Sequence, residues 1–157
     1  MATLGIVGGH AVDEVPASHR DLLDCPPVAA LTTISAAGDP QTSVVWCDTE
    51  GGFVRINTMR GFAKERNMRR DPRVGLLAYD PRDPDRYLGI RGTVVDMTED
   101  GAGRHLDELA SRYLGRPVRY FGEVIPLAFA ETEIPVLCRI RIDHVVAVDA
   151  RAGGGGR

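Results

Sequence analysis

From residue 28 onward, the chain alternates short runs of β-forming residues with segments of turn chemistry. The first three runs cover residues 28–35, 41–47 and 53–58, and the turns between them contain the sequences AAGDP and EGG. Runs of this length that are bounded by glycine or proline are typical of antiparallel strands joined by hairpins. The pattern therefore predicts a mainly β fold that begins with a meander of hairpins.

The rest of the chain continues this pattern, with two helices inserted. Residues 61–70 have helical composition and end at Asp71-Pro72, and residues 102–114 place apolar side chains at helical spacing before Gly115. Gly89 and Gly92 would let a long strand bend, so that the sheet can close into a barrel. Further strands are expected over residues 74–79, 87–97, 135–142 and 144–149, with residues 81–86 as a polar loop and residues 116–134 unassigned.

The length of 157 residues fits one domain with one core. We expect a single barrel domain over residues 16–150, an irregular segment over residues 1–15 and a disordered glycine-rich tail over residues 151–157. Within the domain, Ser18 is expected to cap a short helix that Pro26 and Pro27 stop and that covers one end of the barrel.

Charge and cysteine content argue against several classes of protein. A formal net charge of -3, with acids and arginines interspersed, is unlike a protein whose main partner is nucleic acid. Residues 1–10 do not resemble a signal peptide, and no stretch approaches the roughly 20 apolar residues of a membrane span. The three cysteines, Cys25, Cys47 and Cys138, are widely spaced in apolar stretches and predict buried thiols in a reducing compartment. We therefore expect a cytoplasmic protein that binds neither nucleic acid nor a membrane.

A single lysine stands among the 19 lysine and arginine residues. This residue, Lys64, follows the expected strand end Asn57-Thr58 and lies near the start of the expected helix over residues 61–70. A compact ammonium on a flexible stem suits phosphate binding, and the first amides of a helix also favour an anion. The sequence suggests a phosphate clamp at Lys64, although chance survival of one surface lysine would explain the same observation.

The region from residue 39 to residue 74 resembles a known pattern. It contains the sequence DPQTSVVW, a glycine turn, a strand ending in Asn57-Thr58 and the run Lys64-x-Arg66-Asn67-x-x-Arg70-Asp71-Pro72-Arg73. The pattern is similar to the split β-barrel flavin and deazaflavin oxidoreductases, the superfamily that includes pyridoxamine 5′-phosphate oxidase. The run after Lys64 resembles the B type of this superfamily, which uses the deazaflavin coenzyme F420. The resemblance implies a mainly β fold with a few helices, the FMN-binding split β-barrel, in a homodimer that holds the cofactor at the subunit interface.

Two positions bear on the choice of cofactor within this resemblance. The pyridoxamine phosphate oxidases surround the phosphate of flavin mononucleotide (FMN) with an arginine and a lysine where this chain has Ser43 and Asp48. A dianionic phosphate that loses two cationic partners and faces a carboxylate binds more weakly, because charge-assisted hydrogen bonds are the strong ones. The phosphodiester and oligoglutamate tail of coenzyme F420 match one lysine and nearby arginines. We therefore expect coenzyme F420, with FMN as the alternative.

The resemblance also implies a set of cofactor-binding residues. Lys64 would meet the phosphodiester, the segment from Asn57 to Arg60 would add hydrogen bonds, and the strand over residues 41–46 would line the ring. The full set is Gln41, Ser43, Val45, Trp46, Asn57, Thr58, Arg60, Lys64 and Asn67. Trp46, the only tryptophan, is either a wall of the ring site or ordinary core. The arginines near the helix either attract the acidic tail or form a solvated face; they are Arg66, Arg69, Arg70 and Arg73.

The function that the resemblance implies is hydride transfer from reduced coenzyme F420 to a small, conjugated organic acceptor. No catalytic residue is assigned, although Tyr79 or solvent could supply a proton. The substrate is not identified, because variable loops such as residues 81–86 and 116–134 would form its binding face. The 4 histidines show no metal-ligand spacing, so no metal is expected. The alternatives are an FMN-dependent enzyme of the same fold, a protein that carries or senses the cofactor without turnover, and haem ligation by a histidine.

Overall fold

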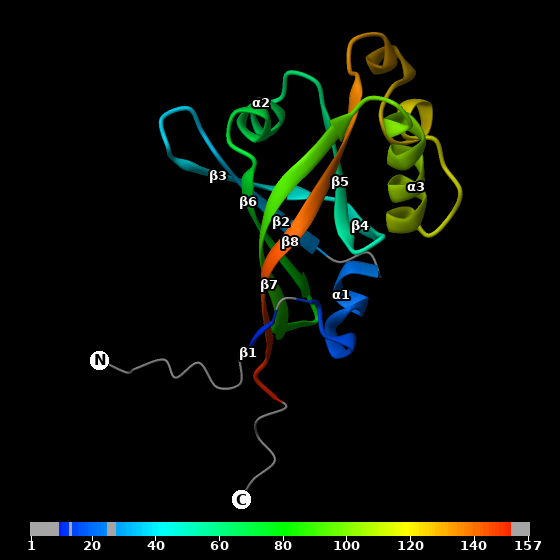
Figure 1. Ribbon diagram of the computed structural model, residues 1–157. Coiled ribbons are helices and arrows are strands. Elements are labelled where there is room, and N and C mark those ends of the chain that lie inside the picture. Colours follow the sequence, from blue (N-terminus) through cyan, green and yellow to red (C-terminus); the bar gives the residue numbers. More distant parts are fainter. Residues whose placement is uncertain (1–9, 13, 25–27, 152–157) are drawn as a thin grey trace, which may run out of the picture.

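The described part of the chain forms one curled, antiparallel sheet with a few helices around it (Figure 1). The computed structural model describes residues 10–12, 14–24 and 28–151. The strand order is β3-β2-β6-β7-β8-β5-β4, and β1 pairs with β8. The strands are β1 (His10–Val12), β2 (Val28–Ile34), β3 (Pro40–Val45), β4 (Cys47–Glu50), β5 (Phe53–Met59), β6 (Arg73–Asp80), β7 (Asp83–Thr98) and β8 (Pro135–Asp149). The mainly β, barrel-like fold expected from the sequence is confirmed.

The two ends of this strand order are consecutive in the chain. β3 and β4 are separated only by Trp46, yet β3 pairs with β2 and β4 pairs with β5. The sheet must therefore curl until its two ends meet at Trp46. The sequence predicts one strand over residues 41–47, and this prediction was wrong, because the two halves of the segment pair with different neighbours and the chain must bend between them.

The interior of the curled sheet holds the core. Alternate residues of β5 point inward, so that Val54 and Ile56 are fully buried while Arg55 between them is only partly buried. The predicted burial of two of the cysteines is confirmed, because Cys47 and Cys138 are buried free thiols. Burial raises the pKa of each thiol to about 12, which leaves both unreactive at neutral pH. Cys25 lies outside the described residues.

The bend predicted near Gly92 is confirmed. A shift in the register between β7 and β8 lies between Arg91 and Gly92, and a Cβ at Gly92 would lie 2.6 Å from Ile140 Cγ2 and 2.7 Å from Arg141 O. Only glycine fits this close approach of the two strands. Two predicted boundaries were wrong: β8 continues through the break expected at residue 143, and β7 already begins at Asp83, inside the expected loop. Residue 143 lies at the register shift with β7, and pairing continues on both sides of it, whereas the segment from Asp83 to Arg86 is extended by pairing with Asp80 and Asp149.

The two longer helices lie towards one end of the barrel. α2 (Ala63–Arg70) packs on β2 and β5, and α3 (Ala102–Leu114) packs on β5 and β8. In Figure 1 these two helices lie towards the upper end, together with the short turns η2 (Tyr120–Val124) and η3 (Leu127–Glu131). Both helices were predicted from the sequence, and Gly115 ends α3 at a φ of 70° as expected.

The N-terminal part differs from the expectation. A short turn η1 (Ala17–His19) leads into α1 (Asp21–Asp24), and Ser18 lies within the turn, where it bonds the neighbouring His19 ring at 2.9 Å and caps no helix. β1 interrupts the segment expected to be irregular, because its backbone pairs with β8 without needing an apolar pattern. Residues 1–9, 13, 25–27 and 152–157, with Pro26, Pro27 and the glycine-rich tail, lie outside the described part.

Among the described residues, no helix is both long enough and apolar enough to cross a membrane.

Candidate functional site

A cleft of ≈ 390 Å³ opens at the end of the barrel where β5 ends and α2 begins. Its walls come from the β3–β4 junction, the end of β5, the start of α2, the inward face of α3 and the turns η2 and η3. The wall is mostly apolar, with polar groups concentrated at the end of β5 and the start of α2. Five of the predicted cofactor-binding residues line this cleft: Val45, Trp46, Asn57, Thr58 and Lys64.

Two polar atoms on this wall have no partner. Asn57 uses its Nδ2 to donate to the Ala102 carbonyl at 2.9 Å and to His105 Nδ1 at 3.2 Å. Its Oδ1 and the Oγ1 of Thr58 are buried without a hydrogen bond to any described residue. Leaving a buried polar atom unpaired costs roughly 1–3 kcal/mol, so such atoms are rare in folded proteins unless a ligand meets them. Asn57 Oδ1 and Thr58 Oγ1 are therefore candidate ligand contacts.

Lys64 is the cation of this cleft wall. Its side chain is half-buried, and its ammonium makes no hydrogen bond or ion pair with any residue from 28 to 151. Burial lowers the pKa of this ammonium. α2 begins one residue earlier, and the residue that precedes it, Phe62, offers no side-chain cap to its first amides. An unpaired ammonium beside uncapped helix amides is a suitable environment for an anion.

Asp48 does not lie on the cleft wall. It is 2% exposed, and its carboxylate accepts hydrogen bonds from Arg55 Nε at 2.8 Å, from the Arg55 terminal nitrogen at 2.6 Å and from His105 Nε2 at 3.2 Å. Burial alone would raise the pKa of this carboxyl, but the hydrogen bonds from His105 and Arg55 and the positive charge of Arg55 outweigh burial and lower it to about 2. The interpretation that Asp48 faces a bound phosphate was wrong, because the carboxylate is buried and forms an ion pair with Arg55 inside the protein.

The other four predicted residues lie outside the cleft wall. Arg60 is exposed and pairs with Glu99, with 2.6 Å between Arg60 Nε and Glu99 Oε1. Asn67 ties α2 to the sheet, because its Nδ2 donates to Gln41 Oε1 at 2.8 Å and to Thr33 Oγ1 at 3.1 Å. Ser43 lies opposite Leu31 on the edge strand β3. Direct cofactor contacts of Gln41, Ser43, Arg60 and Asn67 stay predictions.

Trp46 is only partly buried and lies outside the buried core, and its role as a wall of the ring site stays a prediction. It lines the cleft, and its ring also stacks on Tyr113 with 5.1 Å between ring centroids and meets the edge of Tyr120 at 6.0 Å. Burial raises the pKa of Tyr113 to about 12, which keeps this phenol protonated at neutral pH. The aromatic cluster of Trp46, Tyr113 and Tyr120 joins the β3–β4 junction to α3 and η2, so it fixes one wall of the cleft.

Two titratable side chains of the cleft were missed by the sequence argument. Burial and the nearby Glu133 carboxylate raise the pKa of Tyr120, and both residues line the cleft. Tyr79, the proton donor considered from the sequence, instead lies on β6 opposite Tyr87, away from the cleft wall. The aromatic pair at residues 120–121 was the signal that could have directed attention to the unassigned segment.

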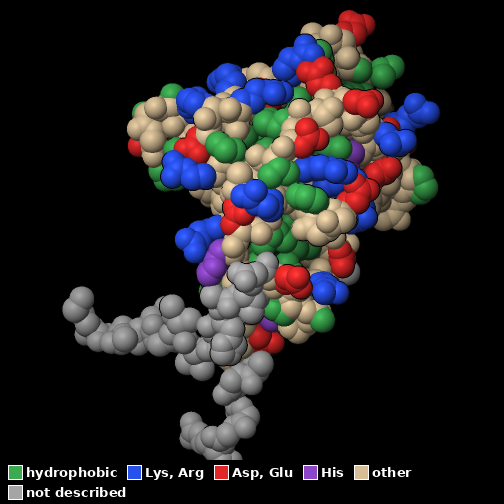
Figure 2. All heavy atoms as spheres, viewed as in Figure 1, with side chains coloured by type: hydrophobic (Ala, Val, Ile, Leu, Met, Phe, Trp, Pro, Cys, Tyr) green, Lys and Arg blue, Asp and Glu red, His purple; other side chains and the backbone are tan. Residues whose placement is uncertain are grey.

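The arginines near α2 already have partners. Arg69 pairs with Glu65, Arg73 pairs with Asp71 at 2.7 Å, and Arg70 donates to the Ile34 carbonyl at 3.1 Å. Arg66 donates to the Gly61 carbonyl. All four are exposed, and Figure 2 shows lysine and arginine side chains gathered over this end of the molecule. Attraction of an acidic tail and a solvated face are both compatible with this arrangement.

Comparison with known proteins points to one family. The sequence model described as pyridoxamine 5′-phosphate oxidase matches residues 15–135. A solved structure named F420 Reductase is 29% identical, with a TM-score of 0.69, over 83% of this chain and 98% of that one. The conserved hypothetical protein Rv2991 from Mycobacterium tuberculosis is 26% identical, with a TM-score of 0.70, over 93% of this chain and 92% of that one. A search of curated proteins found no match.

A more distant structure supports the fold alone. The putative pyridoxamine 5′-phosphate oxidase from Listeria innocua is 18% identical, with a TM-score of 0.55, over 77% of this chain and 87% of that one. At this level of identity the likeness concerns the path of the backbone and carries no information on the ligand.

Proposed function

The chain belongs to the pyridoxamine 5′-phosphate oxidase family, whose members are oxidoreductases, and on this basis we propose that it is an F420-dependent reductase. In this proposal the cleft between β5, α2 and α3 holds coenzyme F420, and a small conjugated organic acceptor is reduced beside it. The 29% identity to the solved F420 Reductase supports this choice within the family.

The observation that carries the proposal is the unpaired polar edge of the cleft. Thr58 Oγ1 and Asn57 Oδ1 have no partner among the described residues, and the half-buried Lys64 ammonium lies on the same wall. A ligand that combines an anionic group with a polar ring would satisfy all three, so the residues present fit a flavin-like cofactor. Lys64 would hold the phosphodiester, and the apolar remainder of the wall would bury the ring.

The single cation of the wall favours F420 over FMN. A phosphodiester carries one negative charge, whereas the terminal phosphate of FMN carries nearly two at neutral pH and gains more from a second cation. Two arginines that flank Lys64 in the sequence are engaged: Arg60 with Glu99 and Arg69 with Glu65. Because Asp48 is buried away from the cleft wall, the preference rests on Lys64 and on the sequence likeness.

The chain's own residues would position the reactants and exclude water. The reduced deazaflavin, when bound, supplies the hydride. The aromatic cluster and the apolar face of α3, with Leu106 and Leu109, form a dry wall against which a planar ring can lie. Tyr120 would donate a proton to the acceptor, since it is a phenol that lies on the cleft wall.

A second copy of the chain would complete the open side of the cleft. Large apolar side chains are exposed around its rim, including Val44 at 69% and Leu127 at 67%, together with Phe62 and Phe129. Such a group of exposed apolar residues is typical of an interaction surface. These residues support the homodimer proposed from the family resemblance, with the cofactor at the subunit interface.

The test is a titration of cofactor-free protein with coenzyme F420 and, separately, with FMN, followed by ligand and Trp46 fluorescence. We expect saturable binding of F420 and weaker binding of FMN. Lys64→Met should raise the Kd for F420 at least about tenfold, since a charge-assisted hydrogen bond contributes roughly 1.5–3 kcal/mol. Arg104→Ala, an exposed arginine on α3, is the matched control for loss of one positive charge and should leave the Kd unchanged.

The outcomes separate the candidates. Selective FMN binding would overturn the choice of cofactor, and an unchanged Kd in Lys64→Met would overturn the role of Lys64. Tight F420 binding without reduction of any of a set of conjugated ketones, quinones and nitroaromatics would point to a carrier or sensor.

A further inference from the structure

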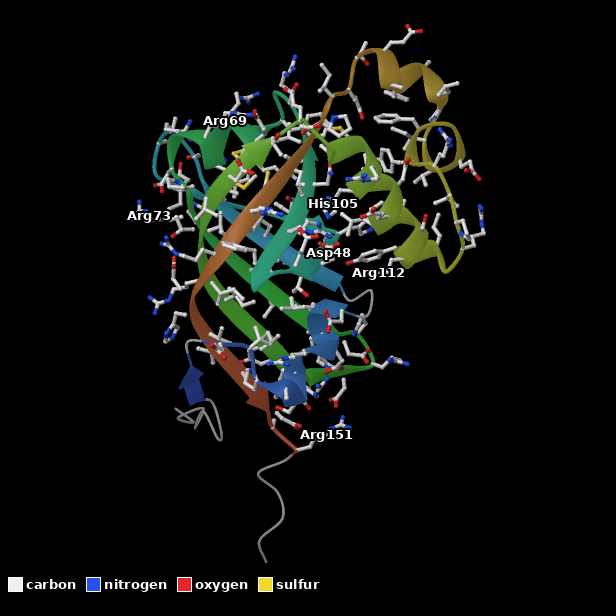
Figure 3. All side chains as sticks on the ribbon, turned by 45° about the vertical axis from the view of Figure 1, so that its right-hand side comes forward. Asp48, Arg69, Arg73, His105, Arg112 and Arg151 are labelled. Carbon is white, nitrogen blue, oxygen red and sulfur yellow. The ribbon has the colours of Figure 1, made fainter. Side chains whose placement is uncertain are left out.

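A buried chain of hydrogen bonds runs from the β4–β5 hairpin to the cleft. It starts at Arg55, passes through the Asp48 carboxylate and the His105 ring, and ends at the Asn57 side chain. Figure 3 shows His105, on α3, next to Asp48, on β4. Asp48 is 2% exposed and His105 is 3% exposed, so the middle of the chain is closed to water.

The direction of the Asn57 amide follows from its two fixed partners. A backbone carbonyl only accepts, so the 2.9 Å contact with Ala102 O must come from the Nδ2 of Asn57. The second Nδ2 hydrogen is directed at His105 Nδ1, 3.2 Å away. Both donors are thereby used on the side of α3, and Oδ1 is left as the free end of the amide.

The same geometry assigns the tautomer of His105. Nδ1 accepts from Asn57 and therefore carries no proton, which places the ring proton on Nε2. From Nε2 the ring donates to Asp48 Oδ1 at 3.2 Å. The two hydrogen bonds from Arg55 keep the Asp48 carboxylate in the position and charge state that accept this proton. A proton on Nδ1 would face the Nδ2–H of Asn57, and the hydrogen bond between His105 and Asn57 would be lost.

We propose that His105 and Asp48 are positioning residues that hold the Asn57 amide with Oδ1 available to the ligand, so that the cleft selects a ligand with an N–H or O–H donor at that point. This inference rests on the proposed function in one respect, that the cofactor occupies this cleft. In addition, it gives the two residues of the wall different ligand groups. The Lys64 ammonium binds an anion, whereas Asn57 Oδ1 repels an anion and accepts a hydrogen bond from an N–H or O–H group. Because His105 and Asp48 lie behind the amide, they act on the ligand only through Asn57.

The first test concerns the tautomer and needs no ligand. In protein labelled with 15N-histidine, a long-range 1H–15N spectrum at neutral pH should show His105 protonated on Nε2 and unprotonated on Nδ1. His105→Gln identifies the signals by their loss. A proton on Nδ1, alone or together with one on Nε2, would overturn the assigned orientation whatever ligand binds.

The second test is a double-mutant cycle on F420 binding. Asn57→Ala and His105→Leu should each raise the Kd about tenfold, in line with the loss of one hydrogen bond to a buried group. The double variant should bind no more weakly than Asn57→Ala alone. Additive losses would mean that His105 acts through the general structure of α3, and would overturn its positioning role.

A conservative variant separates packing from hydrogen bonding. His105→Asn keeps an acceptor near the position of Nδ1 and should restore most of the affinity that His105→Leu loses, provided that thermal melts show both variants folded. Affinity no better than that of His105→Leu would contradict the proposal. Failure of the unaltered protein to bind either F420 or FMN would instead overturn the proposed function, and the tautomer measurement would still decide the orientation of the amide.

Discussion

Two sets of polar groups lie within a few residues of one another on β5 and the elements around it. One set has its hydrogen-bond partners inside the protein, and the other does not. In the inner set, the buried Asp48 carboxylate is bonded by both Arg55 and His105. In the cleft set, Thr58 Oγ1, Asn57 Oδ1 and the Lys64 ammonium have no partner among the described residues. The inner set therefore stabilises the barrel, whereas the cleft set has polar atoms that the fold leaves free for a ligand.

The largest expected effect comes from breaking the inner set. Asp48→Ala would take from the Arg55 guanidinium, only 14% exposed, its two short hydrogen bonds, and from His105 Nε2 its acceptor. Only the exposed Glu50 carboxylate, at 3.0 Å, would then pair with Arg55, so the free energy of unfolding should fall by about 3 kcal/mol. Urea unfolding followed by tryptophan fluorescence measures this loss. Arg82→Ala removes a partner of the exposed Arg82–Asp80 ion pair and should leave the unfolding midpoint unchanged. Equal midpoints for Asp48→Ala and Arg82→Ala would show that the inner set does not stabilise the barrel.

Acid should weaken the inner set in a defined window. The pKa of Asp48 is about 2 in the folded protein, below its ordinary value of 3.8. As the pH falls, the unfolded chain therefore takes up this proton before the folded one does. The stabilisation by Asp48 is fully present above about pH 4 and is lost as the pH falls towards 2.

A comparison with Asp48→Asn isolates this effect from the other carboxylates, which both proteins share. The difference in unfolding free energy between the two proteins should shrink between about pH 4 and pH 2. A constant difference across that window would mean that the Asp48 pKa is not depressed by folding.

The smallest expected effect distinguishes the two sets most sharply. Thr58→Val removes an unpaired buried hydroxyl, so the free energy of unfolding should stay the same or rise by up to about 1 kcal/mol, while the Kd for F420 rises about fivefold. Thr33→Val is the matched control, because Thr33 is equally buried but accepts a hydrogen bond from Asn67 at 3.1 Å. It should lose about 1 kcal/mol of stability and keep its affinity. A stability loss in Thr58→Val like that in Thr33→Val would assign Thr58 to the fold.

Local sequence patterns were sufficient for most of the fold. The runs that became β2 and β5 and the two main helices were predicted because their signals, alternation, helical spacing and Gly115, act over a few residues. The break at Trp46 and the continuity of β8 were not predictable in this way. They depend on which strands become neighbours, and that choice is made by packing between residues far apart in the chain.

The site was predicted unevenly for the same reason. Trp46, Asn57, Thr58 and Lys64 lie in one motif, so a resemblance could identify them together. Tyr120 and Glu133 come from a segment without periodicity, and their neighbourhood exists only once η2 and η3 fold over the barrel end. His105 occupies an apolar helix face where a histidine has no distinguishing spacing, and its role depends on Asp48, 57 residues earlier in the chain.

The junction at Trp46 also limits how the barrel can move. A single residue spans at most about 3.6 Å, so β3 and β4 stay together at this corner through any fluctuation of the folded protein. The Trp46 corner is therefore the part of the cleft wall that moves least when the cleft widens. Ligands would then enter and leave by a slow displacement of the other walls of the cleft relative to the Trp46 corner.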